Sequence, residues 1–214
     1  MDTFTLENET AKIIEDSEDL SKLHDIIENI ELLTPDYLQK VKAETITELT
    51  QQQYLGYLTH IYLFYIKPTK ILYKHYQGIS NNKQITLQYN DNLLYMLSEY
   101  YIYISLNYNK VCNIYGFATL TGIDLNCFER WEKQESQRPQ AYRLVKRLQK
   151  AYETSLENGA QSGKNPVGFI ATLNHRFGWS ADNKPTLTVN ITRTKQEILS
   201  GVDQSLLIEN PTNP

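Results

Sequence analysis

The stretch YGFATLTGIDLNCFERWEK, residues 115–133, carries the strongest structural pattern in the chain. Two helices that cross closely need a small residue at the contact and a turn residue that tolerates positive φ. Ala118 suits the contact, Gly122 suits the turn, and the Asp124 carboxylate can cap the second helix. The stretch therefore predicts a helix-turn-helix. Its structural residues are Ala118, Gly122, Ile123, Phe128 and Trp131.

The second predicted helix carries polar and charged residues on its outward side. With the large apolar residues turned inward, the residues that face outward are Asn126, Glu129, Arg130 and Lys133. In a DNA major groove, Asn can read adenine and Arg can read guanine or bind phosphate, whereas phosphate repels Glu. We interpret this side as a DNA-binding surface with Arg130 as a candidate base reader. A helical corner that binds no nucleic acid can show the same apolar pattern, so a purely structural role of this segment is the alternative interpretation.

A basic stripe is predicted on the next helix, over residues 140–156. Helical periodicity separates its apolar residues from its basic residues. The apolar residues are Ala141, Val145, Leu148, Tyr152 and Leu156, and the basic residues are Arg143, Lys146, Arg147 and Lys150. Such a stripe contacts phosphates or is simply a solvated face, and the pattern alone does not choose between them.

The whole chain is predicted to be mainly α and to consist of three parts. Residues 1–90 form a helical N-terminal extension, and residues 91–182 form the helix-turn-helix with a long helical hairpin. Residues 183–214 form a C-terminal tail. Within this tail, residues 186–192 alternate apolar and polar side chains, which predicts a short strand that could serve in oligomerisation.

The N-terminal part contains local start and stop signals. Thr34 followed by Pro35 is typical of a helix N-cap and first helical position, so a second helix is expected to begin there. Pro68 should end or kink that helix. Residues 77–92 are rich in Gly and Asn and are expected to form a linker containing a short strand at residues 85–89.

Composition limits the functional classes. The net charge is −4, but acidic residues concentrate in residues 1–66 and the remainder is net basic, which is compatible with DNA binding. Cys112 and Cys127 form no CxxC pair, and the N-terminus lacks a secretory pattern, so a cytoplasmic protein is expected. The longest apolar run, residues 54–66, is too short to span a membrane.

No catalytic or cofactor motif is found. Residues 159–165 only faintly resemble a phosphate-binding loop, because the glycines are too close together and Asn165 replaces the magnesium-binding Ser or Thr. The four histidines lie far apart without metal-ligand spacing. We therefore predict no catalytic residue, no cofactor and no metal site, and a protein that is not an enzyme.

Three stretches make the sequence resemble the small terminase subunits of tailed bacteriophages. They are residues 115–133, the helix closing in LENGAQ at residues 156–161, and NPVGFIATLNHRFGWSAD at residues 165–182. The resemblance implies a non-catalytic, homo-oligomeric ring that binds double-stranded viral DNA for packaging and regulates a large terminase subunit. In that case it acts in the host cell cytoplasm. The first ninety residues lie outside the resemblance.

Two other functions fit the same patterns. A transcriptional regulator could use the helix-turn-helix as a dimer on a palindromic site. Alternatively, the helices could scaffold a protein–protein interface with residues 54–66 as its contact surface. If the DNA contact lies elsewhere, the basic residues that occur without acids between them are Lys67, Lys70, Lys74 and Lys83.

Overall fold

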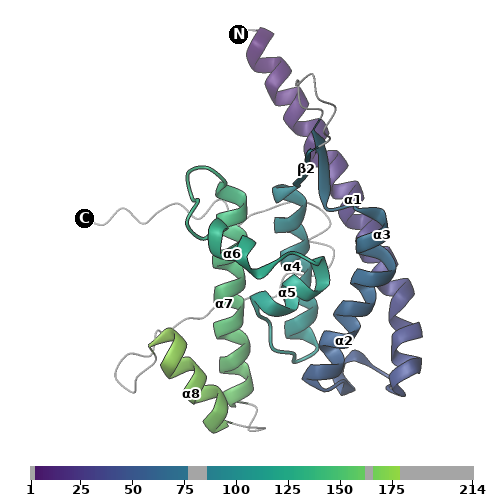
Figure 1. Ribbon diagram of the computed structural model, residues 1–214, viewed down its shortest axis with the longest axis vertical. Helices are drawn as coiled ribbons and strands as arrows, with labels where there is room; N and C mark the ends of the chain where they lie inside the picture. Colours follow the sequence, from purple (N-terminus) through teal and green to yellow (C-terminus); the bar gives the residue numbers. More distant parts are fainter. Residues whose placement is uncertain (1–2, 77–85, 162–165, 179–214) are drawn as a thin grey trace.

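The computed structural model describes residues 3–76, 86–161 and 166–178. Over these ranges the protein is mainly α with one small two-stranded sheet, as the sequence predicted (Figure 1). The elements in chain order are α1 (Thr3–Val41), the 3-10 turn η1 (Ile46–Glu48), α2 (Gln51–Ile61), the π-helical segment η2 (Tyr62–Ile66), α3 (Lys67–Thr69), β1 (Tyr73–Tyr76), β2 (Thr86–Tyr89), α4 (Asp91–Asn107), α5 (Ile114–Thr121), α6 (Leu125–Trp131), α7 (Pro139–Gln161) and α8 (Pro166–Phe177).

Helix α1 continues through Pro35, so the prediction that a second helix begins there is wrong. Thr34 does not act as a cap: its hydroxyl donates to the Ile30 carbonyl at 2.6 Å and lies 2.8 Å from the Tyr57 hydroxyl of α2. On the other side of the proline, Tyr37 donates a hydrogen bond of 2.7 Å to the main chain of α2. Contacts with α2 on both sides of Pro35 thus outweigh the local start signal.

The next α-helix, α2, begins at Gln51 instead, and Thr50 is its N-cap. The Thr50 hydroxyl accepts from the Gln53 N–H at 3.2 Å, and the Gln53 side chain accepts from the Thr50 N–H at 2.9 Å, which is a capping box. Helix α2 then passes through η2, where the Lys67 N–H donates to the Tyr62 carbonyl. Helix α3 ends directly after Pro68, so the predicted stop at this proline is confirmed.

The strand expected at residues 85–89 is present as β2 and pairs antiparallel with β1. Tyr73 lies opposite Tyr89, and their rings stack with centroids 4.9 Å apart. The sequence analysis did not predict β1. The Asn90 side chain then caps α4 by accepting from the Leu93 N–H at 3.2 Å, and its amide donates to the buried Asp19 carboxylate of α1.

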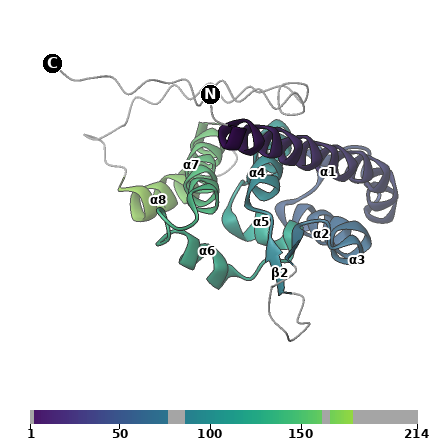
Figure 2. The same ribbon diagram turned by 90° about the horizontal axis from the view of Figure 1, so that it is seen from above.

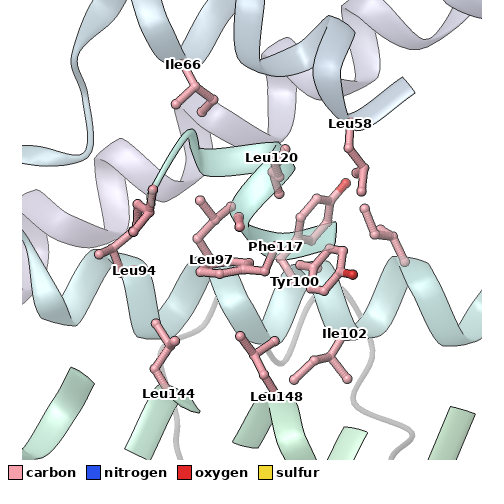
Figure 3. Packing of buried hydrophobic residues seen from close by; sticks show 14 of the residues in the cluster. Leu58, Ile66, Leu94, Leu97, Tyr100, Ile102, Phe117, Leu120, Leu144 and Leu148 are labelled. Atoms are coloured by element: carbon pink, nitrogen blue, oxygen red, sulfur yellow. The ribbon is translucent and has the colours of Figure 1, made fainter. Parts of the chain in front are cut away.

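Helix α4 crosses the centre of the core. Figure 3 shows Phe117 and Leu120 of α5 on one side of α4 and Leu144 and Leu148 of α7 on the other. The residues of α4 that are buried are Leu93, Leu94, Leu97, Ser98, Glu99, Tyr100, Tyr101, Ile102, Ile104 and Ser105. They occur on consecutive positions and not on one stripe, because neighbouring helices cover α4 on several sides.

Helices from both sides of residue 90 share this core. Helix α1 packs on α4, and α2 packs on α5 (Figures 1 and 2). Packing is therefore continuous across residue 90, while the division into residues 1–90, 91–182 and 183–214 stays a prediction. The tail strand expected at residues 186–192 lies outside the described residues.

Aromatic rings join α5, α6 and the sheet within this core. The Phe117 and Phe128 ring centroids lie 6.1 Å apart, and those of Phe128 and Trp131 lie 5.1 Å apart, both edge to face. Trp131 also meets the Tyr89 ring of β2 at 5.9 Å. Four of the five residues that the sequence assigned to the helix-turn-helix core are buried, namely Ala118, Ile123, Phe128 and Trp131.

Replacing Trp131 with alanine should lower the free energy of unfolding by about 3–5 kcal/mol, because it empties a large buried aromatic site. Urea unfolding monitored by circular dichroism measures this change in the free energy of unfolding. Tyr115→Ala is the matched control, since the Tyr115 side chain is 57% exposed, and it should change stability by less than about 0.5 kcal/mol. Equal losses for the two variants would contradict the packing described for Trp131.

Candidate nucleic-acid interface

Helices α5 and α6 are joined by a turn whose geometry depends on one glycine. Gly122 has a φ of 70°, in the left-handed region, and its N–H donates to the Ala118 carbonyl at 2.8 Å. A Cβ at this position would lie 2.2 Å from the Tyr62 ring, so a side chain here would have to displace that ring. Asp124 then caps α6 by accepting from the Asn126 N–H at 2.8 Å. The turn therefore has the conformation that the sequence predicted.

One side of α6 is exposed to solvent, and we call it the outer face. Its residues are Asn126 and Glu129, with Lys133 just beyond the helix end. On the opposite side, Phe128 and Trp131 anchor the helix in the core. The outer face thus presents an amide, a carboxylate and an ammonium group on a short helix that the core holds in place.

Arg130 is exposed but lies on one flank of α6, beside the outer face. Its guanidinium donates to the Cys127 Sγ at 3.1 Å, which directs the side chain along the helix towards β2. Here α6, the following loop and β2 enclose a hollow of about 340 Å³, which we call the Arg130 hollow. Its lining residues are Gln88, Tyr89, Cys127, Arg130, Trp131, Gln134 and Arg138. Gln88, Gln134 and Arg138 were not singled out by the sequence, because they belong to no motif and are brought together only by folding.

The other flank of α6 borders a larger groove of about 710 Å³ between α5, α6, α7 and α8. Its lining combines apolar side chains such as Leu125 and Phe128 with the carboxylates of Glu129 and Glu132. Lys146 and Gln149 donate hydrogen bonds to Glu132 at 2.8 and 2.9 Å, which holds the pKa of Glu132 below its ordinary value. The two flanks of α6 therefore differ in charge: the groove has two carboxylates beside the Arg176 guanidinium, whereas the Arg130 hollow has two guanidinium groups and no acidic residue in its lining.

The predicted basic stripe of α7 is largely ion-paired. Lys146 lies 2.8 Å from Glu132, and Lys150 lies 2.6 Å from Glu153. Arg143 is exposed, and among the described residues it has no carboxylate partner. The stripe therefore offers Arg143 as an unpaired cation, whereas the charges of Lys146 and Lys150 are partly neutralised.

Arg147 does not belong to the exposed stripe, which corrects its predicted placement opposite the apolar side. Its guanidinium donates to both carboxylate oxygens of Glu99 on α4, at 2.7 and 3.0 Å, and the Glu99 side chain is only 7% exposed. Position 147 follows Leu144 by three residues and precedes Ala151 by four, so it lies beside the buried ridge that meets α4. The predicted apolar side of this helix lacked Leu144 and Ala151, which are buried on either side of position 147. The predicted position of Arg147 was therefore too far from α4.

Other sequence features have structural explanations or lie outside the described residues. Gly159 packs against the Phe169 ring of α8, where a Cβ would approach within 2.7 Å, and residues 162–165 of the same stretch are not described. Both cysteines are buried, and burial raises the pKa of Cys112 to about 12. Where the chain is described, no group of three His, Cys, Asp or Glu side chains is placed to hold a metal ion.

The alternative contact surfaces are only partly exposed. Most large side chains of residues 54–66 are buried, so the prediction of a contact surface there is reduced to the exposed Leu63 and Phe64. Lys67 and Lys70 are exposed near the end of α3, whereas Lys83 lies outside the described residues. None of the helices in the described part of the chain is long and apolar enough to cross a membrane.

The buried ion pair predicts a non-additive effect on stability. Glu99→Met leaves the Arg147 charge without this partner and should cost about 3–5 kcal/mol in the free energy of unfolding. Replacing both residues with methionine should cost less than either single removal of charge, since no buried charge is then left alone. Chemical unfolding of the two single variants and the double variant tests this, with the exposed Glu135→Ala as control. Additive losses would show that the two side chains are not coupled.

Comparisons with known proteins add no relative. No protein-family model matches the chain, and searches of curated proteins and of solved structures give no match either.

Proposed function

We propose that this protein binds double-stranded DNA by placing the outer face of α6 in the major groove. The observation that supports this most directly is the construction of α6. A glycine turn and an Asp124 cap set its start, Phe128 and Trp131 anchor one side, and the opposite side is free to meet a ligand. An α-helix fits the width of the major groove, which makes an anchored helix with an exposed polar side a suitable reading element.

The outer face supplies groups suited to base edges. The Asn126 amide can donate to adenine N7 and accept from its N6 amino group. Glu129 can accept from the N4 amino group of cytosine, although it is repelled by nearby phosphates. Lys133, at the end of the helix, is suited to a phosphate at the edge of the groove. Both base-reading residues lie in the first two turns of α6.

Helix α7 supplies a second phosphate contact in this proposal. Arg143 is exposed, and Lys146 is tied to Glu132 directly before Lys133, which places Lys146 next to the end of α6. Lys150 is half-buried and paired with Glu153, so its contribution is expected to be smaller. Arg147 is excluded because its guanidinium is held by Glu99.

The more specific role that we propose is that of a small terminase subunit. Its support is the resemblance of the three stretches described above, of which residues 156–161 close α7 and residues 165–182 include α8. On this proposal the chain is non-catalytic, forms a homo-oligomeric ring, marks viral DNA for packaging and regulates a large terminase subunit in the host cytoplasm. Sedimentation of the purified protein with and without DNA tests ring formation.

Removing a phosphate contact should reduce the salt dependence of binding. For Lys133→Gln and for Arg143→Gln, the slope of log affinity against log salt should fall by about 0.9, because one fewer counterion is released. Lys42→Gln is the control: it follows α1 directly, and α1 ends on the side of the molecule away from α6 (Figure 1). Fluorescence anisotropy over a salt series measures the slopes. If the protein binds DNA but Lys133→Gln and Arg143→Gln both keep the wild-type salt slope, the phosphate contacts lie on another surface.

Removing the base-reading amide should reduce selectivity rather than overall affinity. A preferred site is first selected from a random duplex pool with the wild-type protein. Asn126→Ala should then lose about 1–3 kcal/mol of preference for that site over random duplex. The salt slope should stay unchanged, since no charge is lost. An unchanged preference would assign base reading to other residues.

A further inference from the structure

We propose that the Arg130 hollow binds a backbone phosphate of the DNA, so that Arg130 anchors the phosphate and does not read a base. This inference rests on the proposed DNA-binding function. The hollow lies between β2 and α6. The proposal assigns a nucleic-acid contact to strand β2, which the sequence placed within the linker at residues 77–92.

The chemistry of the lining is that of an anion site. It includes two guanidinium groups, from Arg130 and Arg138, and two amides, from Gln88 and Gln134. None of the residues that line it is acidic. Guanidinium and amide N–H groups are the usual donors to phosphate oxygens, and Arg can present two of them side by side. The groove on the other flank of α6 has the carboxylates of Glu129 and Glu132 beside the Arg176 guanidinium, so it is less favourable to an anion than the Arg130 hollow.

Arg130 is available to such a ligand. Its side chain is exposed, and among the described residues its guanidinium forms no ion pair with a carboxylate. It donates a hydrogen bond to the weak acceptor Cys127 Sγ at 3.1 Å, which orients the group without neutralising its charge. The remaining N–H groups of the guanidinium can therefore donate to an anion in the hollow.

Arg138 gives the hollow a fixed wall. Its Nε donates to Asp91 at 2.9 Å, and its guanidinium lies over the Trp131 ring, 5.1 Å from the centroid. A second N–H group also reaches the Asp91 carboxylate. Because these contacts hold Arg138 in place and offset its charge, we assign the net attraction to Arg130 and a positioning role to Arg138.

The place of Arg130 on α6 favours phosphate over base. The major groove is about 12 Å wide, close to the diameter of a helix with its side chains. Residues on the outermost side of an inserted helix therefore meet base edges, and residues on its flanks meet the sugar–phosphate walls. Arg130 lies on a flank, directed towards β2. Figure 2 shows β2 and α6 on the side of the molecule away from α1, so a duplex on α6 can pass over both.

The test combines variants of Arg130 with duplexes that carry one neutral methylphosphonate at a time. The duplex is the site selected by the wild-type protein, and random duplex serves for comparison. Arg130→Gln should weaken binding to both duplexes by the same factor and lower the salt slope by about 0.9. Arg130→Lys should keep the wild-type slope. At one methylphosphonate position, wild-type binding should weaken while Arg130→Gln binding does not weaken further, because the contact is already lost.

Three outcomes decide the matter, with thermal unfolding of each variant showing that it is folded. A loss of selectivity by tenfold or more in Arg130→Gln with an unchanged slope would make Arg130 a base reader and overturn the inference. A second outcome is that Arg130→Gln keeps the wild-type affinity and salt slope while Lys133→Gln shows its expected fall in salt slope. In that case no phosphate binds in the hollow, and the proposed function still stands. A wild-type protein that binds no duplex would overturn the proposed function together with the inference.

Discussion

The burial of α4 is the constraint on which the other elements depend. Its side chains are buried on consecutive positions, so α4 needs neighbours on several sides at once, and α1, α5 and α7 supply them. Two polar contacts fix its position along its length. At its start, Asn90 caps the helix and donates to Asp19 of α1, and in its middle Glu99 accepts two hydrogen bonds from Arg147 of α7. Because buried polar groups need partners, these contacts select one arrangement of the helices from the many that apolar packing would allow.

The same core determines which charges reach solvent around α6. Phe128 and Trp131 are held inside, which turns the outer face towards solvent and divides the flanking charges into two groups. Two carboxylates and the Arg176 guanidinium border the groove next to α7, whereas two guanidinium groups and no carboxylate line the hollow next to β2. An anionic ligand is therefore favoured at the hollow over the groove, so the proposed interface extends from α6 towards β2. This asymmetry links the β1–β2 sheet to the proposed function.

Local sequence patterns predicted those features in which a few neighbouring residues carry the whole signal. Gly122 was recognised because no other residue takes a left-handed turn at so little cost, and Asp124 because a helix start leaves N–H groups to be capped. Pro68 was recognised for a related reason, since proline cannot donate within a helix. The capping box of Thr50 and Gln53 carried the same kind of signal but was overlooked. Pro35 shows the limit of such signals, because hydrogen bonds between Thr34 and Tyr57 and between Tyr37 and Gln53 tie α1 to α2 on both sides of a proline, and α1 stays helical through it.

The sequence by itself thus determined the mainly α class, the turn between α5 and α6, and the exposed set Asn126, Glu129, Arg130 and Lys133. These depend on periodicity and on the backbone preferences of single residues, which act over one or two helical turns. Only the tertiary structure decided that Arg147 faces Glu99 across forty-eight positions of the chain, and that Gln88 and Arg138 meet Arg130 around one hollow. Contacts of this kind depend on which side of each helix the core covers. A single sequence does not show which side of a helix the core covers. When two sides of a helix carry similar residues, they are distinguished only by the elements that pack against them in the fold.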